Sequence, residues 1–145
     1  MLTKPLVSQE YEVEDPAEAI EFCYRRGWTG GLPVVPPTAP RVRAFLAAGA
    51  QQPADVLGGV PDRGRIFTAE KVAINAVMAG CLPAYAPVVF AAVQAMSKPG
   101  YCLSGASAST GGSAVLTIVS GELARDLGLN AGGNALGAGV RANAT

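Results

Sequence analysis

The sequence predicts a mixed protein of the α/β or α+β class, with about five helices, a small sheet and a central apolar helical hairpin. Half of the 145 residues are apolar and 15% are charged, which suits a chain with one sizeable core. Between Thr68 and Met96, two apolar segments meet at Gly80-Cys81-Leu82-Pro83, where Gly and Pro favour a turn. We expect residues 1–145 to form a single domain or the N-terminal part of a longer one.

Composition narrows the classes of function. The 11 basic and 11 acidic residues balance, whereas nucleic-acid binding usually needs a basic face, so we expect no nucleic-acid partner. No membrane association is expected either, because the most apolar run, Leu82 to Val93, is too short to span a bilayer. Three cysteines without paired spacing, and no signal-peptide pattern, predict a cytoplasmic protein. High apolar content with little charge indicates a homo- or hetero-oligomer.

The absence of histidine restricts the chemistry further. It removes Ser-His-Asp and Cys-His catalysis within the chain, together with histidine-bearing zinc sites. Three isolated cysteines cannot complete a four-ligand structural zinc site, so no metal is expected. Nothing in the sequence identifies a cofactor, which stays unknown.

The N-terminal third begins with residues 1–14, which we expect as an extended arm or, in part, an edge strand. Asp15 is placed to cap a helix, and Glu18 to reach back toward its start. Gly27 is the expected end of that helix. Cys23 lies on the apolar stripe and is expected to be a packing residue.

The next stretch, Trp28 to Thr38, is extended because each proline disfavours the α region at the residue before it. It could line a cleft or serve as a stiff linker. Thr38 is the expected cap of a second helix that ends at Gly49. Three of its side chains should point inward: Val42, Phe45 and Leu46. The polar stretch Gln51 to Arg65 is predicted to be a loop.

In the central hairpin, Thr68 is the expected N-cap of the first helix. Glu70 in its first turn could face a cleft together with Lys71 and Asn75, but a solvated face is the favoured interpretation. Gly80 should end this helix and leave Cys81 just beyond it. A helix C-terminus would raise the pKa of the Cys81 thiol, whereas the N-terminus of the following helix would lower it, and the sequence leaves both possible.

The second helix of the hairpin, about Tyr85 to Met96, is apolar nearly all round and is expected in the core. A small-residue loop and a buried strand, Ala114 to Val119, should follow, and then a short helix, Glu122 to Leu127. The predicted core comprises Val77, Val88, Val89, Phe90, Val93, Leu116, Ile118 and Val119.

Two glycine-rich stretches are candidate anion sites. Ser109 and Thr110 precede Gly111-Gly112, and such hydroxyls could hold a carboxylate or phosphate or could simply form a turn. Near the C-terminus, a glycine loop runs into Arg141, which could bind an anion at a helix start. The alternative is that these glycines are architectural.

Three blocks of sequence, TGGLPVVPPT, AEKVAINAVMAGCLPAYAPVV and NALGAGVRANAT, resemble a little-characterised family of bacterial proteins whose members are longer. The resemblance covers most of Trp28 to Thr145. It departs from the family at Ala138-Gly139-Val140, where Pro-Gly-Asn is typical. Family members accompany, or are fused to, proteins with a (seleno)cysteine-Gly-Ser-Cys motif.

The resemblance implies thiol or selenol redox chemistry, with Cys81 as the catalytic residue and Asn134, Arg141 and Asn143 among the substrate contacts. The expected function is a thiol-dependent redox or lyase-type enzyme, or a subunit of one, acting on a small anionic substrate with a (seleno)protein partner. The alternative is a non-catalytic binding or assembly subunit. Since the residues from Arg141 would begin a helix that continues in the family, we also expect the chain to be a fragment or a split subunit.

Overall fold

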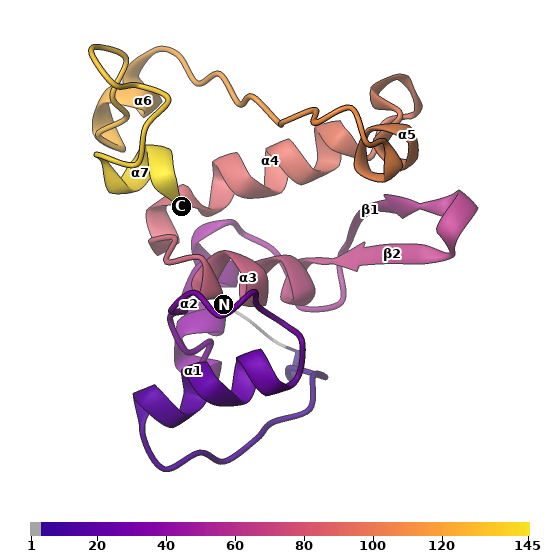
Figure 1. Ribbon diagram of the computed structural model, residues 1–145, viewed down its shortest axis with the longest axis vertical. Helices are drawn as coiled ribbons and strands as arrows, with labels where there is room; N and C mark the ends of the chain where they lie inside the picture. Colours follow the sequence, from indigo (N-terminus) through magenta and orange to yellow (C-terminus); the bar gives the residue numbers. More distant parts are fainter. Residues whose placement is uncertain (1–3) are drawn as a thin grey trace.

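The computed structural model describes residues 4–145, and its architecture is α+β (Figure 1). These residues form seven α-helices and a two-stranded antiparallel sheet. The helices are α1 Pro16–Arg25, α2 Ala39–Ala48, α3 Ala69–Met78, α4 Ala86–Met96, α5 Leu103–Ala108, α6 Glu122–Asp126 and α7 Arg141–Ala144. The strands are β1 Val56–Val60 and β2 Arg65–Thr68. The count exceeds the five predicted helices through α5, which lies in the expected loop, and through the short α7, which begins at Arg141 as expected.

The core lies where α2, α3 and α4 meet. Phe45 and Leu46 of α2 are completely buried. The ring of Phe45 meets the ring of Phe90 from α4 edge to face, with 5.6 Å between centroids, a favourable aromatic geometry. Gly49 makes room for this pair, because a Cβ there would overlap the Phe90 ring. The predicted inward face of α2 is therefore confirmed, and so is the hairpin of α3 and α4.

Local capping sets the start of α1 as predicted. The backbone N–H of Glu18 donates to Asp15 Oδ1 at 2.9 Å, and the Glu18 carboxylate accepts from the N–H of Glu14 at 2.6 Å. Cys23 is buried on this helix, in agreement with a packing role. Thr38 occupies the N-cap position of α2, but its side chain makes no capping hydrogen bond.

The arm, residues 4–14, contains neither helix nor strand, so the edge-strand alternative is wrong there. Residues 1–3 of the predicted arm lie outside the described residues. The N–H groups of Val7 and Ser8 donate to the Glu70 carboxylate, at 3.0 and 2.7 Å. Glu70 is consequently 1% exposed, and its expected place on a solvated face is wrong. Its burial is compensated because the arm supplies hydrogen-bond donors.

The predicted loop at Gln51–Arg65 is also corrected, because it contains β1. This strand pairs with β2, with Gly59 opposite Ile66 and Val60 opposite Arg65. The two glycines of β1 allow neighbouring segments to approach this strand closely. A Cβ on Gly58 would overlap Ser97 beyond α4, and a Cβ on Gly59 would overlap the Arg65 carbonyl. A Gly-Gly pair usually signals a turn, which is why the strand was not predicted.

α4 is buried on one side only. Ala86 and Phe90 are buried. Val88, Val89 and Val93 are half-buried, so the prediction that these three valines lie in the core is only partly confirmed. Among residues 4–145, no helix is long and apolar enough to cross a membrane.

Residues 114–119, the connecting segment between α5 and α6, form no strand within the described chain (Figure 1). Leu116 is 68% exposed and Ile118 is 83% exposed, so their predicted place in a buried strand is wrong. The segment is extended as expected, but β1 and β2 pair with each other at another place in the fold. Burial of this strand would require a neighbour, and residues 4–145 supply none.

Candidate functional site

The candidate site is the elbow, Gly80 to Pro83, between α3 and α4. Gly80 has φ +93°, a conformation that glycine adopts at low cost, and its N–H donates to the Val77 carbonyl at 2.9 Å. The N–H of Cys81 donates to the Ala76 carbonyl at 2.9 Å. These bonds satisfy carbonyls at the end of α3. They leave Cys81 half-buried just beyond the helix, as the sequence predicts.

Arg141, the first residue of α7, reaches the elbow from 61 residues further along the chain. Its Nε and Nη2 both donate to the Gly80 carbonyl, at 2.9 and 2.6 Å. The C-terminus of a helix carries partial negative charge, so a guanidinium there is electrostatically favourable. The structure thus brings together two of the predicted site residues, Cys81 and Arg141.

Thr145 completes this cluster. Its hydroxyl donates to the Arg141 carbonyl at 2.9 Å, one helical turn back, and it also lies within hydrogen-bonding reach of Cys81. Its methyl group lies against Gly80, where a Cβ would be 3.4 Å from Thr145 Cγ2. Thr145 was not predicted as a site residue. The four-residue spacing from Arg141 could have suggested that both share one helix face.

Burial raises the pKa of the Cys81 thiol above its ordinary value. The nearby Thr145 hydroxyl and the positive charge of Arg141 each lower that pKa, but the burial of the sulfur prevails. The thiol is therefore protonated at neutral pH in this state. The sequence offered the two neighbouring helix termini as opposing causes, whereas the largest cause in the structure is burial of the sulfur.

The predicted site residue Asn143 holds the preceding loop together. Its Oδ1 accepts from the N–H of Asn130 at 2.8 Å, while its Nδ2 donates to the carbonyls of Asn130 and Ala135, both at 2.9 Å. These contacts, which we call the Asn143 clasp, use both N–H groups of the amide. They fix the loop from which α7 starts. A substrate contact for Asn143 stays a prediction.

Asn134 shapes the same loop. It has φ +62°, a left-handed conformation that asparagine tolerates better than most residues. A Cβ on Gly137 would overlap its side chain, so the glycine is needed beside it. This supports the architectural interpretation of at least one glycine in the loop.

Ser109 and Thr110 lie apart from the elbow. They follow α5, which sits at the opposite end of α4 from the elbow (Figure 1), and α4 is about 16 Å long at ~1.5 Å per residue. Ser109 Oγ accepts from the N–H of Gly111 at 3.0 Å, which is a local turn contact, and Thr110 is exposed. The structure does not bring this pair together with Cys81.

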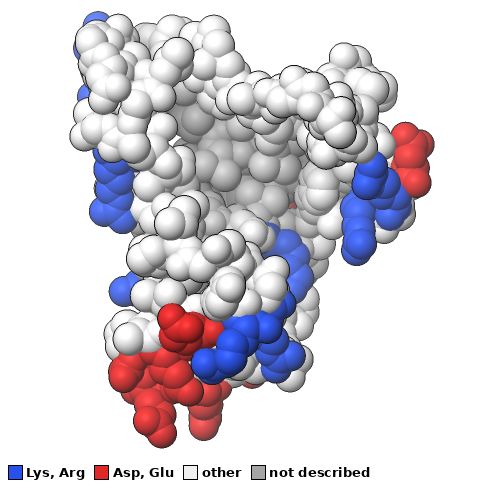
Figure 2. All heavy atoms as spheres, viewed as in Figure 1, with Lys and Arg blue, Asp and Glu red and all other residues white. Residues whose placement is uncertain are grey.

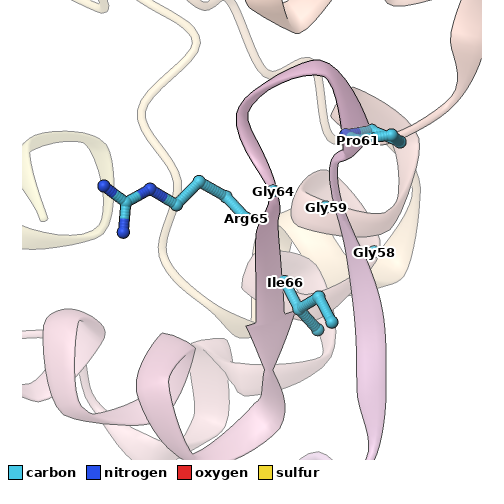
Figure 3. A pocket seen from close by; sticks show the side chains of 6 residues that line it. All are labelled: Gly58, Gly59, Pro61, Gly64, Arg65 and Ile66. Atoms are coloured by element: carbon cyan, nitrogen blue, oxygen red, sulfur yellow. The ribbon is translucent and has the colours of Figure 1, made fainter.

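Two concavities lie at the β-hairpin and not at the elbow. The first, of about 430 Å³, is lined by Gly58, Gly59, Pro61, Gly64, Arg65 and Ile66 (Figure 3). The Arg65 and Ile66 side chains extend in different directions from the strand, and the other lining residues are glycine or proline. The second, of about 390 Å³, lies between β1 and the end of α4. Neither contains a predicted site residue, and the first offers few groups for binding.

Within residues 4–145, no group of three or more Cys, Asp or Glu side chains is placed to hold a metal ion. Comparison with known proteins adds no assignment: no protein-family model, no curated protein and no solved structure matches this chain.

Proposed function

We propose that the chain is a thiol-dependent redox or lyase-type enzyme, or a subunit of one, in which Cys81 reacts and Arg141 contacts a small anion. The observation that carries this proposal is the approach of the Arg141 guanidinium to the elbow that bears Cys81. A guanidinium has five N–H groups, and the Gly80 carbonyl takes two of them. The others suit a carboxylate or phosphate, which guanidinium binds with two parallel hydrogen bonds.

The single charge of Arg141 can balance either a thiolate or a bound anion, but not both. A reaction at Cys81 in the presence of the anion therefore needs a base from the substrate or the partner to accept the thiol proton. An anion at Arg141 should also raise the pKa of the thiol, since it cancels the charge that favours the thiolate.

The redox form of the proposal is thiol exchange with a partner that contains a disulfide or a selenium–sulfur bond. The Cys81 sulfur bonds to one chalcogen of the partner, the partner's own bond breaks, and the leaving thiolate or selenolate takes the proton from Cys81. Cys81 is oxidised to a mixed disulfide while the released chalcogen is reduced, so electrons balance. The resemblance to the bacterial family supports such a (seleno)protein partner.

A second function, a non-catalytic binding or assembly subunit, is favoured by the raised pKa of Cys81. A protonated, half-buried thiol is a weak nucleophile. In this case the Arg141–Gly80 contact and the Asn143 clasp serve only to fasten α7 to the elbow.

The two functions are distinguished by labelling with iodoacetamide at fixed pH and ionic strength, followed by peptide mass spectrometry of each cysteine. For the enzyme, phosphate should slow labelling of Cys81 relative to chloride, and the effect should disappear in Arg141→Gln. Exposed Cys102 is the internal control and should not respond. Equal labelling of Cys81 in both salts would remove the anion site from the proposal.

A direct test of reactivity is mixed-disulfide formation with oxidised glutathione. The enzyme proposal expects a glutathione adduct on Cys81 that is lost in Cys81→Ser. An adduct on Cys102 alone, while Cys81 stays reduced, would favour the assembly subunit.

A further inference from the structure

The connecting segment, residues 114–119, is an extended apolar chain whose backbone makes no hydrogen bond within residues 4–145. Its side chains alternate between two faces, as in a β-strand. Leu116 and Ile118 share the more exposed face, and Val115 on the other face is 56% exposed. Val119, on the same face as Val115, is half-buried, so that face turns partly toward the molecule.

The segment also lacks the sequence features that prevent exposed strands from pairing with one another. Proteins usually guard such edges with charged residues, proline or bulges. Here no charged residue lies between Lys98 and Glu122, and no proline follows Pro99. An apolar extended segment without charges or proline can pair its free backbone N–H and C=O groups with those of another strand.

We propose that residues 115–119 pair in antiparallel fashion with the same residues of a second copy of this chain, about a two-fold axis at Thr117. This register places Leu116 opposite Ile118 of the second copy and Val115 opposite Val119. Thr117 faces its own counterpart, and Thr–Thr pairs are favourable across strands. Each apolar residue thus meets an apolar partner, and each pair occurs twice about the axis, as in a two-fold symmetric interface.

The near-palindromic order Val-Leu-Thr-Ile-Val at 115–119 is why a second copy is the occupant, because the reversed segment presents matching side chains, and the lack of charge is compatible with this pairing. Two copies of an uncharged segment bring no like charges together, whereas a charged partner would gain no opposite charge from it. Figure 2 shows that this face of the molecule is hollowed and that most atoms around the hollow belong to uncharged residues. A standard interface covers about 800 Å² on each partner, more than a short strand pair provides, so we expect a dimer that dissociates on dilution.

The first test is the mass of the full chain by sedimentation over a range of concentrations, where we expect a dimer. Ile118→Lys should weaken the dimer at least tenfold, because the two-fold axis places its ammonium in the apolar strand pair. Leu32→Lys is the matched control, since Leu32 is 78% exposed and lies outside the segment, and it should leave the dimer intact. Circular dichroism should show both variants folded, because both positions are exposed.

The second test locates the axis, in a Cys102→Ser background that removes the exposed thiol. Thr117→Cys should form a disulfide-linked dimer under mild oxidation, because residue 117 faces itself. Ser113→Cys should not, because that residue would face Gly121 of the second copy. The proposal is overturned by a monomeric chain, by a dimer that survives Ile118→Lys, or by equal cross-linking at positions 113 and 117. A monomer whose segment becomes protected only by a different protein overturns it as well.

Discussion

The Glu70 carboxylate joins the arm to the first turn of α3. It is buried, and the hydrogen bonds from Val7 and Ser8 replace its lost hydration. Hydrogen bonds to a charged acceptor contribute about 1.5–3 kcal/mol each when they are well formed, more than neutral ones do. A single side chain therefore fixes a segment that has no secondary structure of its own.

Replacement of Glu70 by glutamine should lower the free energy of unfolding by about 2 kcal/mol, because the amide loses the charge and turns an N–H₂ group toward other donors. The measurement is urea denaturation at pH 7. Glu21→Gln, on the exposed side of α1, is the control and should change stability by less than about 0.5 kcal/mol. An equal effect of both substitutions would show that the arm contributes nothing.

The contribution of Glu70 should also depend on pH. Burial raises the pKa of this carboxyl. Hydrogen bonds from Ser8 and Val7 and the charge of the nearby Lys71 lower that pKa by more, so it lies below its ordinary value. A depressed folded-state pKa means that the stabilisation is complete above the unfolded value of about 4.3 and is lost as pH falls through the folded one. The stability difference between the wild type and Glu70→Gln should therefore shrink below pH 4. A constant difference down to pH 2 would contradict this assignment.

Cys81 offers a second prediction for single residues. The rate of its alkylation should rise with pH to a midpoint above about 8.5, because burial disfavours the thiolate. Arg141→Gln should move the midpoint higher still, and Arg141→Lys, which keeps the charge, should move it less. Arg125→Gln, in the last turn of α6, is the control. A midpoint below 8 in the wild type would show that Arg141 outweighs burial.

Among the elements, α4 shows how far an apolar pattern can mislead about burial. Nearly every side of this helix is apolar, yet only Ala86 and Phe90 are buried. The neighbouring helices α2 and α3 cover one side, and the other side keeps Val88 half-exposed. Val88→Asp should consequently cost less than the same change at a fully buried position, since part of the charge would remain in water.

The one-sided burial of α4 predicts unequal effects of two truncations. Phe90→Ala should cost about 3–5 kcal/mol, because it leaves a cavity beside Phe45. Val88→Ala should cost about 1 kcal/mol, because its surroundings already include solvent. Chemical denaturation of the two variants compares them directly. Similar losses would show that both faces of α4 are covered.

For the whole molecule, the fold combines a three-helix core with long extended stretches that pack little. Amide hydrogens in α2, α3 and α4 should exchange slowest, since these helices enclose the core. Every second amide of 115–119, on the residues whose N–H groups point to the second copy, should exchange slowly in the self-paired state and rapidly in Ile118→Lys, where the strand has no partner. Rapid exchange of these amides in both proteins would argue against strand pairing.

Local features of this protein could be predicted from the sequence because their causes lie within a few residues. The cap at Asp15 and the ends of α2 and α3 at glycine depend on neighbours along the chain. The elbow with Cys81 is another local feature, since Gly80 and Pro83 impose the turn. These local patterns leave the α/β and α+β classes both open, and the antiparallel pairing of β1 with β2 decides for α+β.

Only the tertiary structure decided which groups are covered and which are brought together. Glu70 is buried because a distant arm supplies its donors, and Leu116 and Ile118 are exposed because no strand within residues 4–145 lies beside them. Arg141 reaches Gly80 from 61 residues away, a contact that no local pattern encodes. Burial and long-range hydrogen bonds depend on how segments approach in space, whereas caps and turns depend on the order of residues in the chain.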